Sequence, residues 1–419
     1  MIEAPPLDPL AAAAYAALFG VVVVATLRRQ VDAIVALLAT APLAYAHAVG
    51  ATTLTFGKVA LIAVVAGLIL QRPSLGWLQR GVPRSLFLPI AAVVAATALS
   101  ILVATDRAVA LRETLKAVQY LLTFVVAAIA WHLDPDRARL RTTIVAIASL
   151  VAVLALAQEF SGAPSGIWYD GKAYPRIAGP LEGPNQLAGY LGVVLPFILV
   201  FALDAPSWPA LVAAAVCGAA LILTLSRAGL LAGLVAIATV LIARPALRRA
   251  ASVALATGFV AGIGVVLGWR VAALDERFVS LAEVEQSGGV GTRSILWRAA
   301  VELWRSHPLL GVGAGNYELL LPGVAPPGIR THTNSWYLQS LVEGGLPLLG
   351  ATLWLVWASI ASLRRVLRND LCLAAFAASI GFALHGVFDL LVFFPKIGLT
   401  WFALLGVAAA ESLRIDTNA

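Results

Sequence analysis

The chain has 419 residues, of which 61% are hydrophobic and only 12% are charged. An ordinary soluble domain carries about 25% charged residues, and the mean hydropathy of +0.91 is too high for a water-facing surface over this length. The composition therefore excludes soluble enzymes, secreted disulfide scaffolds and disordered chains. It predicts a polytopic membrane protein.

The net charge of +7 comes from 29 Lys and Arg residues against 22 Asp and Glu residues. Cytoplasmic loops of membrane proteins collect Arg and Lys, so we expect these cations in loops and expect no nucleic-acid partner. Cys217 and Cys372 lie inside apolar runs and predict neither a disulfide nor a zinc site. The acidic start of the chain, MIEAPPLDPL, is not typical of a cleavable signal peptide.

Apolar runs suited to crossing a bilayer, which takes about 20 largely apolar residues, recur along the whole chain. They lie near residues 11–27, 31–48, 57–71, 86–104, 115–132, 141–159, 185–203, 207–224, 228–243, 249–268, 334–361, 371–389 and 395–412. Polar and apolar residues do not alternate in them, which excludes a strand barrel. The predicted fold is all-α, a polytopic helical bundle forming one integral membrane domain over residues 1–419.

Short arginine-rich connections alternate with connections of another character, and the positive-inside rule places the arginine-rich set and the C-terminus in the cytoplasm. This set holds Arg28, Arg29, Arg72, Arg80, Arg84, Arg137, Arg139, Arg141, Arg244, Arg248, Arg249, Arg364, Arg365 and Arg368. Residues 160–184, the Ser226-Arg227 turn and a large loop over 269–333 then face outward. That loop contains an amphipathic helix, TRSILWRAAVELWRS, ended by Pro308 and expected to lie in the membrane interface.

Four outward-facing arginines stand close to the membrane boundary: Arg176, Arg227, Arg293 and Arg330. A guanidinium presents a planar fork of donors that matches phosphate oxygens and stays charged. The group therefore predicts an anionic, lipid-linked ligand, most simply a phosphate or diphosphate, with Asn185 and Ser226 as supporting polar residues. The alternative for each arginine is snorkelling to the lipid headgroups.

His332 is the histidine best placed for chemistry, since it lies beside Asn334 at the outward start of an apolar run. Its reference pKa of about 6.5 suits proton transfer near neutral pH, and we expect nearby arginines to lower it further. A structural or capping role is the alternative. His47 and His385 lie in or beside apolar runs, while His132 is cytoplasmic and His307 precedes a proline.

Metal chemistry finds little support in the sequence, so we expect no metal site and no cofactor. No His or Cys stands at ligand spacing from His332, and no HExxH motif occurs. Asp134-Pro135-Asp136 imitates the acidic pair of many glycosyltransferases, but it lies on the predicted cytoplasmic side.

Several motifs occur together in a known order: GPNQLAGYLGVVLP, TLSRAG, Arg293-x-x-x-Trp297, HPLLGVGAGNY and HTNSWYLQSLVEGGLPLLG. In these motifs, over about residues 160–360, the chain resembles the O-antigen ligase and polymerase superfamily, and most closely its lipopolysaccharide O-antigen ligases. The resemblance implies a GT-C-like bundle of about twelve transmembrane helices with both ends inside. One of the thirteen runs would then not span the membrane.

By position, the resemblance makes His332 the family's essential histidine, Arg227 the arginine of its Ser-Arg turn and Arg293 the arginine of its loop helix. The chain departs from the family at Asn334-Ser335, where many members have His-Asn, because the histidine here stands two residues earlier. The implied reaction transfers O-antigen polysaccharide from undecaprenyl diphosphate to a sugar hydroxyl of lipid A–core. It would take place on the periplasmic face of the bacterial inner membrane, with inversion and without metal.

Three other functions remain open at this point. An O-antigen polymerase would use the same donor with a second lipid-linked repeat unit as acceptor. A protein O-oligosaccharyltransferase would modify Ser or Thr, but few residues follow the last apolar run, whereas those enzymes commonly carry a further periplasmic domain. A transporter of a lipid-linked anion would place charges deep in several helices rather than at the outer boundary.

Overall fold

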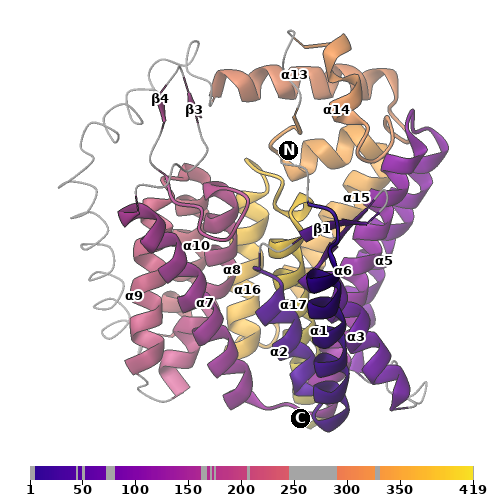
Figure 1. The fold of residues 1–419 in the computed structure, drawn as a ribbon. Helices are drawn as coiled ribbons and strands as arrows, with labels where there is room; N and C mark the ends of the chain where they lie inside the picture. Colours follow the sequence, from indigo (N-terminus) through magenta and orange to yellow (C-terminus); the bar gives the residue numbers. More distant parts are fainter. Residues whose placement is uncertain are drawn as a thin grey trace.

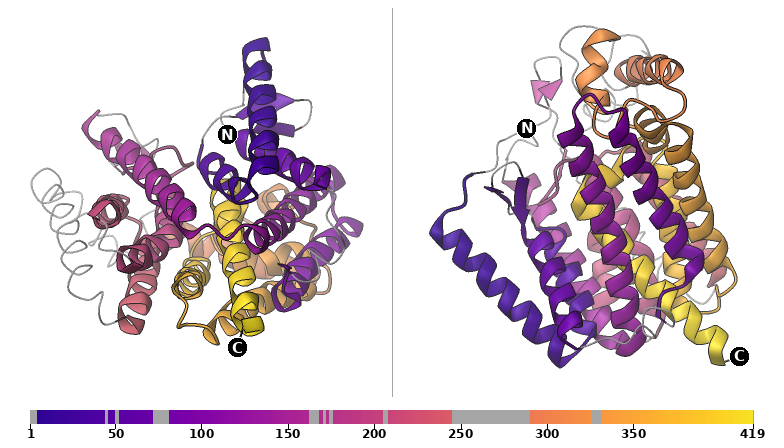
Figure 2. Two further views of the ribbon diagram at one scale, coloured as in Figure 1. Left: turned by 90° about the horizontal axis from the view of Figure 1, so that it is seen from below. Right: turned by 90° about the vertical axis from the view of Figure 1, so that its right-hand side faces the viewer.

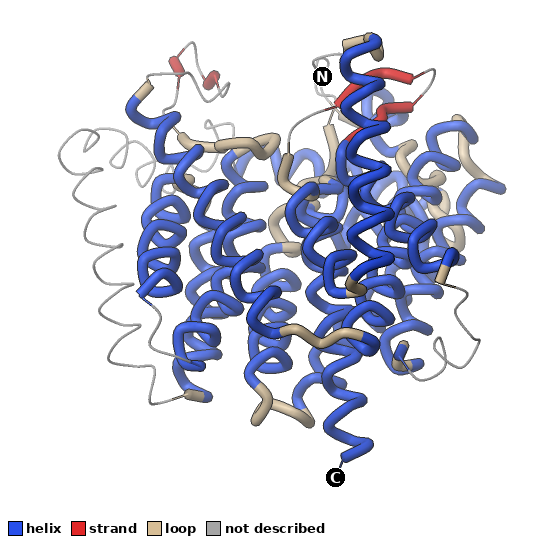
Figure 3. Tube along the Cα trace, turned by 60° about the horizontal axis from the view of Figure 1, so that its bottom comes forward, coloured by secondary structure: helices blue, strands red, loops and turns tan. Residues whose placement is uncertain are grey.

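The computed structural model describes residues 5–43, 46–49, 52–71, 81–161, 168–169, 172–173, 176–204, 208–244, 290–325 and 331–418. Nearly all of this part of the chain is helical, and two short β-hairpins lie toward one end of it (Figure 3). The predicted run 249–268 and Arg330 lie outside the described residues. The predicted loop 269–333 is described over 290–325 and 331–333.

The elements follow one another along the bundle as antiparallel helices. The first half contains α1 (Pro9–Arg28), α2 (Val31–Thr40), β1 (Ala46–Val49), β2 (Thr52–Thr55), α3 (Phe56–Leu70), α5 (Arg84–Leu99), α6 (Arg107–Leu133) and α7 (Arg137–Phe160). The second half contains β3 (Trp168–Tyr169), β4 (Lys172–Ala173), α8 (Pro184–Asp204), α9 (Trp208–Leu223), α10 (Arg227–Ala243), α13 (Val290–Ser306), α14 (Tyr317–Leu320), α15 (Trp336–Arg364), α16 (Asp370–His385), the 3-10 turn η4 (Leu391–Phe393) and α17 (Pro395–Asn418).

In the described part of the chain, seven helices are long and apolar enough to cross a membrane, and five further apolar helices are shorter. This confirms the predicted fold class, an all-α polytopic membrane protein. Large apolar side chains stay exposed on the outside of the bundle, among them Leu10 (81%), Ile242 (71%) and Trp357 (66%). Such exposure suits a surface that faces lipid tails rather than water.

The predicted helix over 31–48 is wrong in its second half. Helix α2 ends at Thr40, and residues from Ala46 onward pair with Thr52–Thr55 as the antiparallel hairpin β1–β2. Pro42 follows the helix end at the position where proline commonly stops a helix. The run is mostly apolar, so its composition predicted burial and did not reveal the change from helix to strand.

The described chain begins and ends toward opposite ends of the bundle (Figures 1 and 2), so the expectation of both ends on one side is wrong. Helix α1 starts toward the end that carries α13, and α17 finishes at the other end. Helix α17 runs through the middle of the molecule, in contact with α6, α8 and α16. The predicted arginine-rich connections that are described, such as the ends of α1 and α15, gather at the same end as the C-terminus.

At that end, the Asp134-Pro135-Asp136 sequence forms ion pairs with Arg29. One guanidinium nitrogen lies 2.9 Å from an Asp134 oxygen and another lies 3.0 Å from an Asp136 oxygen. Asp136 also caps α7 by accepting a hydrogen bond from the N–H of Arg139. The acidic pair therefore joins α1, α6 and α7, which explains it without a metal ion.

Helix α15 is broken at Gly345, where φ is 63° and ψ is −156°. The Ser340 and Thr352 hydroxyls lie 3.1 Å apart, whereas a straight helix would separate residues twelve apart by about 18 Å. The outer segment, before Gly345, therefore folds back against the inner segment that follows it. The sequence predicted one continuous helix here.

The loop after α13 caps this break. The N–H of Val312 donates to the carbonyl of Val342 and the N–H of Gly313 donates to that of Glu343, both at 2.9 Å. A break in a membrane helix leaves backbone groups without helical partners, and these must be satisfied by protein where water is absent. The sequences HPLLGVGAGNY and VEGGLP are thus two halves of one structural unit.

Candidate active site

The turn between α9 and α10 places Arg227 at the end of the bundle that carries α13, which we call the outer end. Leu225 adopts a left-handed conformation with φ of 50°, which is strained for a bulky residue and is typical of functional turns. Ser226 follows in an extended conformation and caps α10 by accepting a hydrogen bond from the N–H of Gly229 at 3.3 Å. One terminal nitrogen of Arg227, Nη1, is buried and has no hydrogen-bond partner among the described residues.

Arg176, which precedes α8, forms hydrogen bonds both to this turn and to α8. Its Nε donates to the carbonyl of Thr224 at 2.7 Å, and its Nη2 donates to Oδ1 of Asn185 at 3.0 Å. The side chain is buried, with 7% of the residue exposed. The sequence grouped Arg176, Asn185 and Ser226 around one ligand, and the structure brings them together around one turn.

Helix α13 supplies Arg293 and Trp297 across the outer end of the bundle (Figure 1). Its apolar residues Leu296, Ala299 and Leu303 are buried against α14, α15 and the loop before α14. The amphipathic pattern was therefore recognised correctly, but this apolar face packs on protein rather than on the membrane interface. Trp297 Nε1 donates to the carbonyl of Thr333 at 3.0 Å, so the Arg-x-x-x-Trp motif links one arginine to the loop of His332.

His332 lies in the short segment that leads into α15. Its Nδ1 is 3.0 Å from the hydroxyl of Thr331, and its ring stacks on Phe393 with centroids 5.4 Å apart. The other ring nitrogen, Nε2, is buried without a hydrogen-bond partner among the described residues. Asn334, two residues later, has a left-handed backbone with φ of 54°, a conformation that asparagine tolerates well.

Two residues that the sequence did not single out complete the group. His385 ends α16, and Asp389 lies in the turn that follows it, with its N–H bonded to the carbonyl of His385 at 3.0 Å. His385 Nε2 and Asp389 Oδ2 are buried and lack partners among the described residues. A Cβ at Gly229 would stand 3.3 Å from the His385 ring, so this histidine lies against the Ser226-Arg227 turn.

We call Arg227, Arg293, His332, His385 and Asp389 the outer site, because their charges act on one another. Asp389 interacts electrostatically with Arg293, His332 and His385, and Arg293 interacts with Arg227. Burial lowers the pKa of Arg293, Asp389 opposes this shift, and Arg227 adds to it. A guanidinium keeps its charge under such conditions, so the site holds two neighbouring cations and one carboxylate.

The pKa of His332 is lowered, as expected, but for a different reason. Burial is the largest cause; Asp389 and Glu318 oppose it, and Lys116 adds to it. The sequence predicted that arginines would lower this pKa, whereas the cation that does so is Lys116 on α6. Its ammonium lies 4.3 Å from the centre of the Phe393 ring, the ring on which His332 stacks.

Four buried polar atoms in the outer site thus have no protein partner in the described chain: Arg227 Nη1, His332 Nε2, His385 Nε2 and Asp389 Oδ2. Buried polar groups are nearly always hydrogen-bonded, and exceptions call for an explanation such as a ligand site. Within the described ranges, no group of three or more His, Cys, Asp or Glu residues could hold a metal ion. The arrangement suits an anion beside the arginines, with an acid–base group next to it.

Residues 210–355 match a family model described as O-antigen ligase. Over these residues the chain is similar to O-antigen ligases. This segment includes the Ser226-Arg227 turn, Arg293, His332 and the Gly345 break, while Arg176, Asn185, His385 and Asp389 come from the flanking helices and turns. The resemblance seen in the sequence motifs is confirmed over this segment, which supports a membrane glycosyltransferase of the O-antigen ligase and polymerase type. No curated protein matches the chain.

Proposed function

We propose that the protein transfers O-antigen polysaccharide from undecaprenyl diphosphate to a sugar hydroxyl of lipid A–core at the periplasmic face of the inner membrane. The observation that carries this proposal is the group of four buried polar atoms without partners in the described chain, which lie beside the half-buried guanidinium groups of Arg227 and Arg293. An anionic substrate with a reactive hydroxyl partner would satisfy all four.

The donor diphosphate binds at Arg227 and Arg293 in this proposal. Charge-assisted hydrogen bonds from arginine to phosphate are short and often bidentate, and Arg227 Nη1 has no other partner in the described chain. As the glycosidic bond breaks, negative charge develops on the leaving diphosphate, and fixed cations in a water-poor site stabilise it. Arg176 supports the turn through Thr224 and adds its own positive charge nearby.

His332 acts as the general base. Its Nε2 accepts the proton of the acceptor hydroxyl, whose oxygen attacks the anomeric carbon, and the bond to the diphosphate oxygen breaks with its electron pair leaving on the diphosphate. Direct attack inverts the configuration of that carbon. The lowered pKa of His332 keeps the imidazole neutral and able to accept a proton near neutral pH, and Asp389 stabilises the imidazolium that forms.

In this proposal both substrates bind at the outer end of the bundle. The arginine-rich connections gather at the opposite end, which the positive-inside rule assigns to the cytoplasm. Because the donor already carries its diphosphate leaving group, the reaction requires neither a nucleotide nor a cofactor. Lipid A–core and the lipid-linked donor would both reach the site from the bilayer.

Purified protein mixed with lipid-linked polysaccharide and lipid A–core tests this proposal. We expect a ligated product on a lipopolysaccharide gel without added metal or nucleotide. An O-antigen polymerase would instead lengthen the donor chains when lipid A–core is left out. Absence of ligated product together with chain lengthening would replace the ligase assignment with the polymerase assignment.

A further inference from the structure

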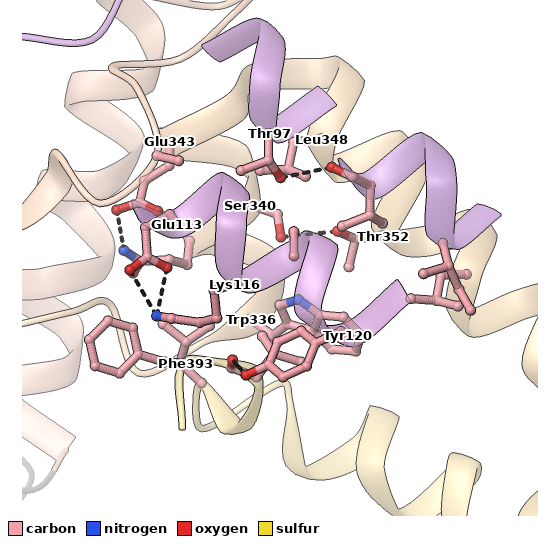
Figure 4. A pocket seen from close by; sticks show the side chains of 18 of the residues that line it. Thr97, Glu113, Lys116, Tyr120, Trp336, Ser340, Glu343, Leu348, Thr352 and Phe393 are labelled. Carbon is pink, nitrogen blue, oxygen red and sulfur yellow. Dashed lines mark hydrogen bonds and ion pairs between the residues drawn. The ribbon is translucent and has the colours of Figure 1, made fainter. Parts of the chain in front are cut away.

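A pocket of about 110 Å³ lies beside the outer site, enclosed by α5, α6, α15 and α17 (Figure 4). Phe393 lines this pocket and also stacks on His332, so the pocket begins one side chain away from the proposed base. The loop that caps the α15 break contributes Ala314 to the lining. The pocket therefore lies toward the outer end of the bundle.

The lining combines aromatic side chains with three hydrogen-bonded polar pairs. The aromatic residues come from four different elements: Tyr120, Trp336, Phe393 and Phe402. The polar pairs are Lys116 with Glu113 at 2.8 Å, Gln339 with Glu343 at 2.7 Å and Ser340 with Thr352 at 3.1 Å (Figure 4). Pockets of this kind, apolar and aromatic with a few placed polar groups, are typical of small-molecule sites.

The ionisable groups in the lining do not favour an anionic occupant, because the ammonium of Lys116 is already paired with Glu113. Glu113 and Glu343 supply two carboxyl groups, and Lys116 supplies the one ammonium among the lining residues. A phosphate placed here would meet more acidic than basic groups, whereas the arginines of the outer site suit it. The two neighbouring regions therefore select for different parts of a substrate.

The polar pairs argue against a purely hydrocarbon occupant as well. A prenyl or acyl chain gains nothing from buried carboxyl, amide and hydroxyl groups, and burying such groups carries a free-energy cost. A pyranose ring has apolar faces, which pack on aromatic rings, and a rim of hydroxyl groups, which can join hydrogen-bonded pairs. The aromatic side chains of the lining match the apolar faces of such a ring, and the polar pairs match its hydroxyl groups.

The size of the pocket limits the occupant to one ring. Its volume of about 110 Å³ is small beside the roughly 300–1,000 Å³ of ordinary ligand pockets. A single sugar can enter with part of its ring in the pocket, and a chain of sugars cannot. The remainder of a glycan would extend outward past Ala314 or toward the outer site.

We infer that this pocket binds one neutral sugar ring of a glycan substrate and holds it next to His332. The identity of the glycan rests on the proposed function, because either the donor polysaccharide or the lipid A–core acceptor could supply the ring. The shared chemistry is an uncharged, hydroxyl-bearing pyranose, and binding experiments separate the two sources.

The test introduces phenylalanine at two positions of the pocket lining, one on each of two helices, and compares these variants with a control outside the pocket. Thr352→Phe on α15 and Val93→Phe on α5 both place a ring in the pocket. Leu353→Phe introduces the same side chain at the next residue of α15, where the side chain is half exposed on the outside of the bundle. Thermal melting in detergent confirms that each variant is folded, and Val93→Phe stands alone if Thr352→Phe does not fold.

Binding is measured by microscale thermophoresis with three probes: undecaprenyl diphosphate, undecaprenyl-diphosphate-linked polysaccharide and lipid A–core. We expect the two filled variants to bind at least one glycan-bearing probe about tenfold or more weakly, which is about 1.4 kcal/mol. We expect undecaprenyl diphosphate to bind at the parental affinity. The probe that weakens identifies the source of the sugar.

Two outcomes overturn the inference. If undecaprenyl diphosphate weakens as much as the glycan-bearing probes, the pocket holds the prenyl chain. If all three probes bind as tightly as to the parent, or if Leu353→Phe weakens them equally, the pocket holds no substrate sugar. Because these are binding measurements, failure of the parent to ligate would reject the proposed function and still leave the pocket tested.

Discussion

The rings of His332 and Phe393 stack with their centroids 5.4 Å apart and their planes 18° apart. The ammonium of Lys116 lies 4.3 Å from the centre of the same Phe393 ring. A protonated His332 would therefore stand near a second cation on a shared aromatic ring. This arrangement, together with burial, favours the neutral imidazole that a general base requires.

The pH dependence of the reaction should report this arrangement. A base works in its neutral form, so kcat/KM should fall as the pH drops through the pKa of His332, which burial places below 6.5. Lys116→Gln removes a cation that lowers this pKa, so the acidic limb of the profile should move to higher pH. The exposed Arg305→Gln on α13 serves as the control and should leave the limb in place. An unchanged or downward-shifted limb in Lys116→Gln would contradict the assignment.

Replacement of His332 should separate catalysis from binding. A positioned general base contributes about 10²–10⁴-fold to a rate, so His332→Ala should lose detectable ligation while its affinity for undecaprenyl diphosphate stays near parental. His332→Gln keeps a hydrogen-bonding group but cannot accept the proton effectively, and we expect it to be equally inactive. Near-parental turnover in the glutamine variant would show that His332 only orients the acceptor.

The two arginines of the outer site should contribute to donor affinity. Arg227→Ala or Arg293→Ala removes hydrogen bonds to a charged group and should weaken undecaprenyl diphosphate binding by about 1.5–3 kcal/mol each. Lysine should restore only part of the affinity, because the planar fork is lost. Arg298→Ala, which changes an exposed arginine of the same helix α13, is the matched control. Parental affinity in both site variants would reject the diphosphate assignment.

The break in α15 should tolerate no side chain at Gly345. The residue has a φ of 63°, and an added Cβ would collide with the backbone of Leu309. With its ψ of −156° this conformation is essentially restricted to glycine and costs other residues about 1–3 kcal/mol, so Gly345→Ala should lower the thermal midpoint in detergent. Gly350→Ala lies on the same helix with no atom within 4 Å of the added Cβ, and it should melt at or above the parental temperature. Equal midpoints for the two variants would mean that α15 is not broken in solution.

Ligation should proceed without a divalent metal. The sequence holds no recognisable metal motif on the outward side, and Asp134 and Asp136 are engaged by Arg29 at the opposite end. Activity in EDTA should therefore persist, although it can slow, because divalent ions also bridge lipopolysaccharide phosphates. Complete loss in EDTA with rescue by magnesium or manganese would overturn this expectation.

The helical class and most of the helix positions could be predicted from hydropathy, because a bilayer demands long apolar runs. The β1–β2 hairpin could not, since residues 46–49 continue the apolar run of α2 without a change in composition. The break at Gly345 had a visible signal, the pair Gly344-Gly345 before Pro347. Glycine is common in membrane helices, so that signal alone did not distinguish a break from ordinary helix packing.

The site residues that lie within sequence motifs could be predicted. Arg227, Arg293 and His332 come from separate motifs, and the structure brings them to one end of the bundle through α10, α13 and the start of α15. Asp389 was missed because it is a single charge beside an apolar run, and Lys116 was missed because it lies three residues from Glu113, the spacing of an ordinary ion pair on a helix. Only the packing of α6 and α16 against the turn at η4 places these charges next to His332.

The capped break in α15 also bears on how the protein is made. Chains are synthesised from the N-terminus, so the Val312 and Gly313 N–H groups leave the ribosome before the Val342 and Glu343 carbonyls that accept from them. The donors are thus already synthesised when the broken helix follows. The N–H donors are therefore made before the carbonyl groups of the break enter the bilayer, where unsatisfied backbone groups are costly. If the helix were made before the loop, these carbonyl groups would lack their partners.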